Sequence, residues 1–383
     1  MSAPLDVPPD ALPNAHPEVK RTPLHEIHEG LGANLVDFAG YLMPLRYGSE
    51  TAEHLAVRTS AGLFDISHMG EIFVSGAQAA AALDYALVGN LSALALGRAR
   101  YTMICDAAGG ILDDLIVYRM ADETFMVVAN ASNVAVVRDA LIDRATPYDA
   151  EVDDRSESYA LIAVQGPKAQ EILYRVTQAP LAELKYYAIL AGEVAGLDVL
   201  IGRTGYTGED GFELFVSSGD AVALWQALTK AGEDDLKPAG LSARDTLRLE
   251  AGMPLYGNEL STETTPYDAG LGRVVKLDKA EDFVGREALT AVAETPPGRT
   301  LVGLVAKGRR VPRHGYSVVT TGEQGGTPCG VVTSGAPSPT LGKPIAMAYL
   351  DTGTGTADLA VDIRGKHEPV DVVSLPFYKR VVP

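Results

Sequence analysis

A chain of 383 residues is too long for one compact domain and is expected to form two or three. Its 32 basic and 50 acidic side chains give a formal charge of −18, which argues against a general binder of nucleic acid or of anionic membranes. There is no apolar run of about 18 residues, so no transmembrane helix is expected. The two cysteines, Cys105 and Cys329, lie in no metal-ligand spacing and favour a reducing cytoplasm.

The N-terminal segment is predicted to be a disordered extension over residues 1–21. Its first 20 residues contain five prolines and several acids, without the basic and apolar regions of a signal or transit peptide. Ordered structure is expected from Thr22, a suitable N-cap, with Pro23 at the first helical position. A second helix is expected over residues 50–59 and leads into a strand over residues 64–68.

Three residue types of a hydrolase triad occur close together at Asp65, Ser67 and His68. A catalytic triad is a spatial arrangement, however, and no Gly-x-Ser-x-Gly elbow surrounds Ser67, so a hydrolase is not expected. The nearby histidines also lack a His-Glu-x-x-His spacing, and we expect no metal site.

Residues 100–130 are predicted to form apolar strands, the second of which contains the adjacent carboxylates Asp113 and Asp114. Because a strand alternates its faces, the two acids point to opposite sides. The side chains expected on the same face as Asp114 are those of Leu112, Ile116 and Tyr118. Acids among apolar side chains must be partnered or shifted in pKa, and such acids cluster at functional sites. The pair is the best catalytic candidate, unless the strand lies at a sheet edge and both acids face solvent.

A weak internal repeat relates residues 72–79 to residues 162–169 at a constant offset of 90, and residues 215–228 repeat the theme loosely. Each copy is predicted to be a strand, a glycine break and an amphipathic helix. This pattern indicates duplicated α+β modules in the first part of the chain, with chance similarity of strand–turn–helix units as the alternative.

The segment 203–216 contains three glycines that permit tight turns, followed by a predicted strand that carries Glu213. No Lys-Ser/Thr follows the glycines, so the segment is not a P-loop, and it lacks the EF-hand ligand pattern. A plain hairpin with Glu213 facing outward is one interpretation. The other is a site for a heterocycle with amide-like donors, built from an aromatic side chain, free backbone N–H groups and a carboxylate.

Residues 242–251 are predicted to form a helix, with Ser242 and Asp245 as a capping-box-like start and Gly252 as the stop. Arg244 lies in the first turn, where the helix dipole disfavours a cation. An anionic partner would explain the arginine there, and that partner is either a ligand or a neighbouring aspartate.

From about residue 300 the sequence changes to short alternating strands with frequent Gly and Pro and no helical pattern. The expected strands are 301–305, 316–319, 330–332, 345–350, 360–363 and 370–373. They predict an antiparallel barrel or sandwich that ends in a segment with paired basic residues.

Eight short motifs occur one after another along the chain. They are GYLMP at 40–44, LFDISHM at 63–69, GGILDD at 109–114, LIAVQGP at 161–167, GYTGEDG at 205–211, ARDTLRLEA at 243–251, YG at 256–257 and SGAPSP at 334–339. In this order they resemble the aminomethyltransferase (T-protein) family of the glycine cleavage system. The resemblance covers essentially everything after residue 21.

The resemblance implies a three-domain cloverleaf around a central folate site, of α+β class, with ferredoxin-like modules followed by a C-terminal antiparallel β-barrel. The expected divisions are an extension over 1–21, a folate-binding α+β domain over 22–155, a second α+β domain over 156–295 and the barrel over 296–383.

The resemblance also assigns roles to single residues. Asp114 matches the family's catalytic aspartate, Glu213 its pterin-binding carboxylate and Arg244 the arginine near the glutamyl tail. The other residues that it places at the folate are Tyr206, Tyr101, Ile116, Tyr118, Asn130 and, at the variable C-terminal end, Tyr378 and Arg380. A further pocket aromatic is either Tyr186 or Tyr187.

The implied reaction moves the one-carbon unit of an aminomethyl group from the reduced lipoyl arm of H-protein to tetrahydrofolate, a co-substrate. It releases ammonia and gives 5,10-methylenetetrahydrofolate. Glycine decarboxylase and dihydrolipoyl dehydrogenase are the implied functional associates, and nucleic acid and membrane are not expected partners. The alternatives are a folate-dependent demethylase on the same fold and a non-catalytic folate-binding accessory protein.

Overall fold

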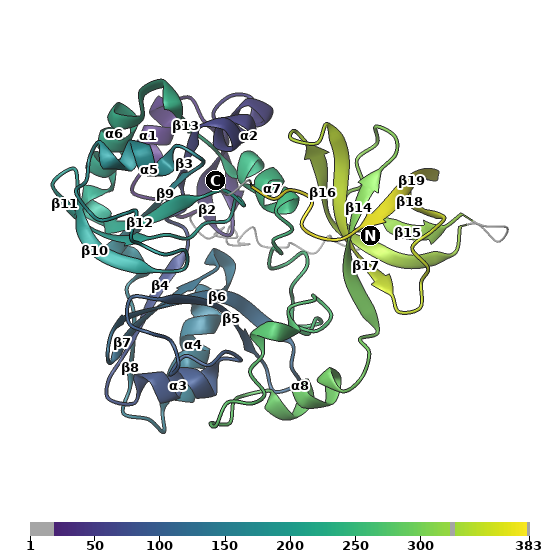
Figure 1. Cartoon of the computed structure of the whole chain (residues 1–383), viewed down its shortest axis with the longest axis horizontal. Helices are drawn as coiled ribbons and strands as arrows, with labels where there is room; N and C mark the ends of the chain where they lie inside the picture. Colours follow the sequence, from purple (N-terminus) through teal and green to yellow (C-terminus); the bar gives the residue numbers. More distant parts are fainter. Residues whose placement is uncertain (1–18, 322–325, 381–383) are drawn as a thin grey trace, which may run out of the picture.

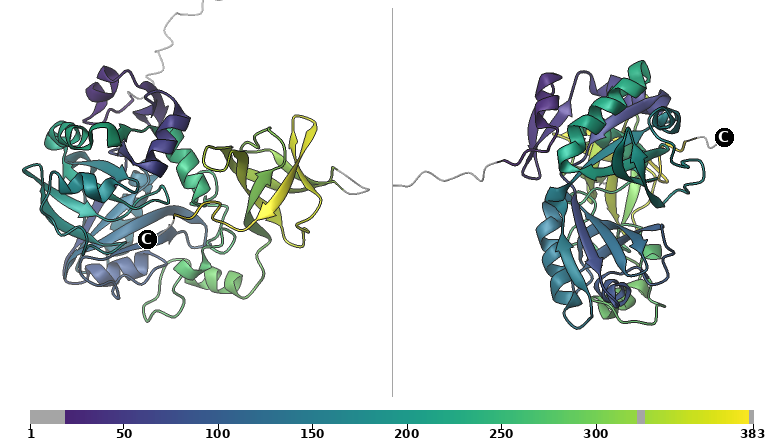
Figure 2. Two further views of the ribbon diagram at one scale, coloured as in Figure 1. Left: turned by 45° about the horizontal axis from the view of Figure 1, so that its top comes forward. Right: turned by 90° about the vertical axis from the view of Figure 1, so that its left-hand side faces the viewer.

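The computed structural model describes residues 19–321 and 326–380. Figure 1 shows two α/β modules, one above the other, with a β-barrel beside them, and the barrel keeps this place in the left view of Figure 2. Most of the expected N-terminal extension over residues 1–21 lies outside the described residues, and Lys20 forms an isolated bridge with Tyr41. No helix among residues 19–321 and 326–380 is long and apolar enough to cross a membrane.

The first module is an antiparallel sheet in the order β5-β6-β7-β4-β8, covered on one face by α3 and α4. Its elements are β4 (Gly70–Ser75), α3 (Ala79–Ala86), β5 (Ala99–Cys105), β6 (Ile111–Ala121), β7 (Thr124–Ala129), η1 (Ala131–Asn133), α4 (Val134–Ala145) and β8 (Glu151–Asp154). Leu83 of α3 and Val137 of α4 pack with Leu115 and Val127 of the sheet in one buried core.

The second module repeats this order of elements. They are η2 (Ser156–Ser158), β9 (Tyr159–Gln165), α5 (Ala169–Tyr174), β10 (Ile189–Val194), β11 (Leu197–Gly202), β12 (Gly211–Ser217), η3 (Ser218–Asp220), α6 (Ala221–Gly232), η4 (Glu233–Asp235) and β13 (Leu236–Pro238). Gly76 and Gly166 occupy the same place after the first strand of each module, at φ 129° and 137°, where a Cβ atom would clash with backbone. The predicted duplication of α+β modules is confirmed.

The two sheets pack face to face. Phe73, Met126 and Tyr118 of the first sheet share a buried cluster with Leu161 and Phe215 of the second. The helices α3 and α4 therefore lie on the outer face of the first sheet, away from the second sheet.

The N-terminal elements join the second module. They are α1 (His25–Gly30), β1 (Asn34–Phe38), β2 (Tyr41–Arg46), α2 (Glu50–Thr59) and β3 (Ala61–Asp65). Strand β3 pairs with β9 and, in parallel, with β13, which gives the sheet order β10-β11-β12-β9-β3-β13. The domain boundary expected at residue 155 stays a sequence prediction. Strand β3 precedes that boundary in the sequence but belongs to the sheet of the second module.

Some local expectations were wrong. Helix α1 begins at His25, later than the sequence predicts. The Thr22 hydroxyl accepts from the Leu24 N–H at 3.3 Å in the turn before the helix, and it donates to the buried Asp65 carboxylate at 2.6 Å. The strand expected over residues 64–68 is β3, which ends at Asp65. Helix α2 covers the predicted residues 50–59.

Helix α7 (Leu241–Glu250) lies between the second module and the barrel (Figure 1). It begins after Gly240 and has no side-chain cap, so the expected capping box of Ser242 and Asp245 is wrong. The Gly240 N–H instead donates to the buried carboxylate of Glu53 at 3.0 Å. The following segment, with η5 (Gly272–Val274) and α8 (Arg286–Ala293), packs back against the first module around Met103.

The barrel is closed and antiparallel, in the order β14-β17-β16-β15-β18-β19. Its strands are β14 (Arg299–Ala306), β15 (Ser317–Thr320), β16 (Pro328–Ser338), β17 (Lys343–Asp351), β18 (Leu359–Ile363) and β19 (Lys366–Val373). All six predicted strands are present, and the barrel alternative is confirmed over the sandwich.

Candidate active site

A cavity of about 360 Å³ lies between the two sheets, α7 and the segment that follows α7. This volume is in the range of small-molecule sites. Eight residues predicted for the site line the cavity, namely Tyr101, Asp114, Ile116, Tyr118, Asn130, Tyr206, Glu213 and Arg244. They come from β5, β6, the end of β7, the glycine-rich loop before β12, β12 itself and α7.

The two adjacent acids lie in the interior of a sheet, because β6 pairs with both β5 and β7. The solvent-facing alternative for an edge strand is therefore wrong. Asp113 is fully buried on the helix-covered face, whereas Asp114 faces the cavity with Ile116 and Tyr118. Leu112 does not share the face of Asp114 as expected, because a register shift at this point turns it toward the helix-covered core.

Asn130 holds both acids. Its side-chain nitrogen donates to Asp113 Oδ1 at 2.8 Å and to Asp114 Oδ1 at 2.9 Å, and its backbone N–H donates to Asp113 Oδ2 at 3.0 Å. Asn133 adds a donor to Asp113 at 2.7 Å, and the Tyr101 hydroxyl donates to Asp114 Oδ2 at 3.0 Å. Both carboxylates are thus fixed by donors, and Asp114 is presented to the cavity.

Burial raises the pKa values of both Asp113 and Asp114. It raises the pKa of Asp113 to about 7, with the charge of Asp114 as a second cause, and it raises the pKa of Asp114 to about 6. The hydrogen bonds from Asn130 and Tyr101 oppose the shift of Asp114 because they favour its ionised form. A carboxylate with a pKa near neutrality in a partly dry cavity is suited to proton transfer or to stabilising positive charge.

Glu213 lies in the middle of β12 and is buried, so the outward-facing alternative is wrong. The Thr204 hydroxyl donates to Glu213 Oε2 at 2.5 Å, and the hydroxyls of Thr204 and Tyr118 lie 2.7 Å apart. Burial raises the pKa of Glu213. The carboxylate keeps capacity to accept N–H donors from a ligand in the cavity.

The Arg244 guanidinium has no hydrogen bond or ion pair to any residue in 19–321 or 326–380, and it lies 4.7 Å from the centre of the Tyr206 ring. Its neighbour on the helix, Arg248, pairs with Asp245 at 2.8 Å and with Glu259 at 2.9 Å. Asp245 is thus engaged elsewhere, and the alternative of a neighbouring aspartate for Arg244 is wrong. Burial lowers the pKa of Arg244. A half-buried cation without an ion-pair partner, facing a cavity, favours a polar or anionic ligand group.

The C-terminal candidates lie outside this cavity. The Tyr378 ring stacks on the Arg58 guanidinium at 4.0 Å, and Arg380 lies 3.4 Å from Asp210 and 5.5 Å from the Tyr186 ring. Neither side chain lines the cavity, so a ligand contact from either stays a prediction. Of the two adjacent tyrosines, Tyr187 lines the cavity and Tyr186 does not.

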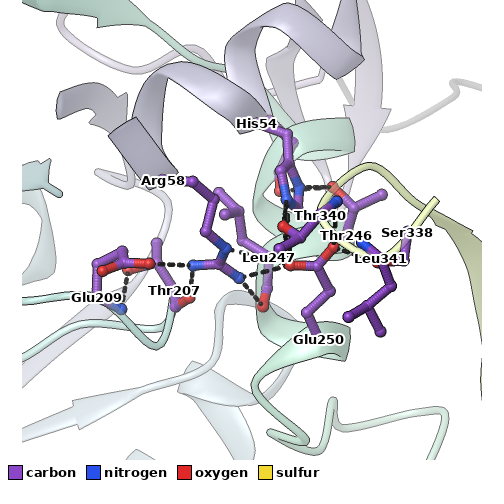
Figure 3. A network of polar contacts seen from close by, with 11 residues as sticks. His54, Arg58, Thr207, Glu209, Thr246, Leu247, Glu250, Ser338, Thr340 and Leu341 are labelled. Atoms are coloured by element: carbon purple, nitrogen blue, oxygen red, sulfur yellow. Dashed lines mark hydrogen bonds and ion pairs between the residues drawn. The ribbon is translucent and has the colours of Figure 1, made fainter. Parts of the chain in front are cut away.

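A buried polar network joins the barrel to the glycine-rich loop (Figure 3). Glu250, at the end of α7, accepts from Arg58 at 2.9 Å, from the Ser338 hydroxyl at 2.5 Å and from the Thr340 hydroxyl at 2.7 Å. Arg58 also donates to the backbone oxygen of Thr207 at 2.7 Å. The loop that carries Tyr206 is therefore tethered to α2, α7 and the barrel at once.

Asp65, Ser67 and His68 form no triad. The Asp65 carboxylate pairs with His28 at 2.8 Å and accepts from the Ser67 backbone N–H, and neither ring nitrogen of His68 bonds to Ser67. His68 nevertheless lines the cavity, a placement that sequence reasoning missed. The only signal for it was the position of His68 within the LFDISHM motif.

The chain is similar to known proteins along nearly its whole length. The family model of the GCVT N-terminal domain matches residues 24–279, and that of the glycine cleavage T-protein C-terminal barrel domain matches residues 299–379. An aminomethyltransferase of Streptomyces avermitilis is 65% identical over 368 residues, which cover 94% of this chain and 98% of the relative. One from Saccharopolyspora erythraea is 63% identical, with 94% and 98% covered. The crystal structure of glycine cleavage system aminomethyltransferase T from Bartonella henselae superposes with a TM-score of 0.88 at 39% identity, covering 94% of this chain and 98% of that one.

Proposed function

The chain belongs to the glycine cleavage T-protein family of aminomethyltransferases, and from this premise we propose its substrates and the roles of its residues. The donor is an aminomethyl group on the reduced lipoyl arm of H-protein, and the acceptor is tetrahydrofolate. The products are 5,10-methylenetetrahydrofolate, ammonia and dihydrolipoyl H-protein.

The observation that carries this proposal is the single cavity that holds a raised-pKa carboxylate, Asp114, together with a buried carboxylate, Glu213, and an unpaired arginine, Arg244. A pterin needs flat apolar contacts and an acceptor for adjacent N–H groups. Tyr101, Tyr187 and Ile116 offer the first, and Glu213 offers the second. These residues fit tetrahydrofolate as the co-substrate.

Arg244 is assigned to an electron-rich part of the folate, with the glutamyl tail as the expected partner. Tyr206 supports this side chain through its ring and is itself held by a hydrogen bond from its hydroxyl to the Pro254 carbonyl oxygen. The loop conformation that places Tyr206 is in turn fixed by Arg58 through Thr207. Folate recognition on this side therefore depends on contacts that reach the barrel.

Asp114 is assigned the catalytic role. Its carboxylate is held by Asn130 and Tyr101, so it can orient the attacking folate nitrogen and stabilise positive charge on the transferred carbon without reorganising. The neighbouring Asp113 is buried on the other face and cannot reach the cavity. Its role is to hold Asn130, which in turn orients Asp114.

The partners that follow from this proposal are lipoylated H-protein as the carrier of the one-carbon unit, and glycine decarboxylase and dihydrolipoyl dehydrogenase as functional associates. The lipoyl arm is a flexible thioether-bearing chain, and it has to bring its carbon to Asp114 in the same cavity that holds the folate.

The test supplies aminomethyl-loaded, lipoylated H-protein and tetrahydrofolate and measures ammonia and 5,10-methylenetetrahydrofolate. Equal amounts of the two products, dependent on both substrates, are expected. Folate binding without either product would contradict the proposal. Methyl transfer from a sulfonium or aryl ether donor in its place would favour the demethylase alternative.

A further inference from the structure

His68 follows β3 and lines the cavity from the side of the second module. Its side chain is only 3% exposed, and its Nδ1 atom is fully buried without a hydrogen-bond partner. Among residues 19–321 and 326–380, no donor or acceptor pairs with either ring nitrogen. Buried polar side chains in proteins are nearly always paired, so an imidazole without a partner in the wall of a cavity indicates a ligand group that pairs with it.

Two other buried histidines around the second module are fully paired, unlike His68. His28 bonds to Tyr47 through Nδ1 and to Asp65 through Nε2, both at 2.8 Å. His54 bonds to Thr246 at 2.7 Å and to Thr340 at 3.0 Å. His25 also lacks a hydrogen bond, but its Nε2 atom lies 3.3 Å from Glu29 and it does not line the cavity.

The surroundings of His68 keep its ring uncharged. Burial lowers its pKa to about 4, and the nearby charge of Arg244 acts in the same direction, against the opposing charge of Asp65. Asp65 is already engaged by Thr22 and His28. Phe38 packs edge-on against the imidazole at 5.5 Å and fixes its plane. At neutral pH the ring therefore offers one donor nitrogen and one acceptor nitrogen.

Arg244 places His68 next to the other polar residues of the cavity. All three side chains line the cavity, and the charge of Arg244 lowers the pKa values of both His68 and Glu213. Glu213 as a carboxylate only accepts hydrogen bonds and Arg244 only donates them. The rim of a pterin alternates N–H donors with nitrogen and carbonyl acceptors, and a neutral imidazole is the partner that matches either kind.

We propose that His68 is a folate-binding residue whose imidazole hydrogen bonds to the heteroatom rim of the pterin, beside Arg244 and Glu213. The inference rests on the proposed function, because it takes the ligand of the cavity to be tetrahydrofolate. It goes further in assigning a third polar contact to a residue that the motif comparison left without a role.

The direct test observes the ring nitrogens. Protein labelled with [15N]histidine is titrated with tetrahydrofolate kept reduced by thiol, and the His68 signals are assigned by their loss in His68→Gln. We expect both ring 15N signals of His68 to report a neutral imidazole and to move on saturation, while the signals of His25 stay unchanged. Saturation without movement of the His68 signals would overturn the inference.

Binding constants of variants give an independent readout. His68→Phe is expected to raise the Kd for tetrahydrofolate about tenfold, because it keeps the ring shape and removes both nitrogens. His68→Gln restores a donor and an acceptor and should stay within about threefold of the wild type. His25→Phe, an equally buried histidine outside the cavity, is the matched control and should leave the Kd unchanged.

These experiments distinguish the failure of the His68 assignment from the failure of the proposed folate-dependent function. Normal folate binding by His68→Phe, with unmoved 15N signals in the wild type, would remove His68 from the site and leave the proposed function intact. Failure of the wild type to bind tetrahydrofolate would overturn both. If His68→Phe does not fold, the 15N titration of the wild-type protein still decides the question.

Discussion

The side-chain nitrogen of Asn130 donates to the Asp114 carboxylate at 2.9 Å, although Asn130 follows strand β7 and Asp114 lies within β6. The same nitrogen lies 2.8 Å from Asp113, on the opposite face of the strand. One amide at the end of a neighbouring strand thus fixes two acids that the sequence places side by side. The orientation of the catalytic candidate is a property of the sheet and not of β6 alone.

This relationship predicts the effect of Asn130→Ala. The variant should lower turnover by about tenfold or more, because Asp114 loses a positioned donor while keeping Tyr101. Steady-state rates with saturating substrates measure the effect. Asn133→Ala is the matched control, since Asn133 donates to Asp113 and has no contact with Asp114. Equal losses in the two variants would mean that Asn130 acts through stability only.

The raised pKa of Asp114 predicts an acid limb in the rate. Its proposed role needs the ionised form, which becomes populated as the pH rises through about 6. Turnover at saturating folate should therefore increase between about pH 5 and pH 7 and then level off. Because Asp113 and Asp114 interact, the limb belongs to the pair. Asp114→Asn should leave a low rate without this limb, and a limb that survives in the variant would assign it to another group.

Glu213→Gln should weaken folate binding more than it lowers the rate at saturation. The amide replaces one acceptor oxygen by a donor, so a pair of N–H groups on the ligand loses one partner. We expect the Kd for tetrahydrofolate to rise by about tenfold or more. Glu193→Gln, on the exposed surface of β10, serves as the control. An unchanged Kd in Glu213→Gln would remove this residue from the site.

Glu250 predicts a pH-dependent contribution to stability. Its hydrogen bonds with His54, Ser338 and Thr340 outweigh its burial and lower its pKa from 4.5 to about 2. A depressed folded-state pKa stabilises the fold above the unfolded value, and that stability is lost as the pH falls from about 4.5 to about 2. Glu250→Gln should therefore lower the free energy of unfolding by about 3 kcal/mol at pH 7. Denaturant unfolding should show this deficit shrinking toward acid pH, whereas a deficit independent of pH would contradict the account.

Much of the fold could be predicted from local patterns. The six barrel strands and helix α2 follow from alternation, turn residues and helix signals that lie within each segment. The duplication could be predicted because each module repeats strand, glycine and helix at a constant offset. The parallel pairing of β3 with β13 could not, since its partners lie about 175 residues apart in sequence, as Ala61 and Leu236 do. The true start of α1 was missed because the Thr-Pro pair at 22–23, a typical helix start, lies in the turn before the helix.

The residues of the site also fall into two groups: those that local motifs predict and those that only the tertiary structure reveals. The motifs led to Asp114, Glu213 and Arg244, which the fold brings to one cavity. Residues that act through contacts between distant segments gave no local signal. Arg58 and Glu250 are ordinary helix residues in the sequence, and only the packing of α2 against α7 and the barrel joins them. His68 was visible only as one member of a motif, and its unpaired ring nitrogen requires the structure.

The most direct test of the account compares folate binding with turnover in Asp114→Asn. The account predicts a Kd for tetrahydrofolate close to that of the wild type and a loss of about 10²-fold or more in the coupled release of ammonia and 5,10-methylenetetrahydrofolate. That result would make the carboxylate a participant in the reaction. Parallel losses of binding and rate, or full turnover in the variant, would contradict the assignment of Asp114 as the catalytic residue.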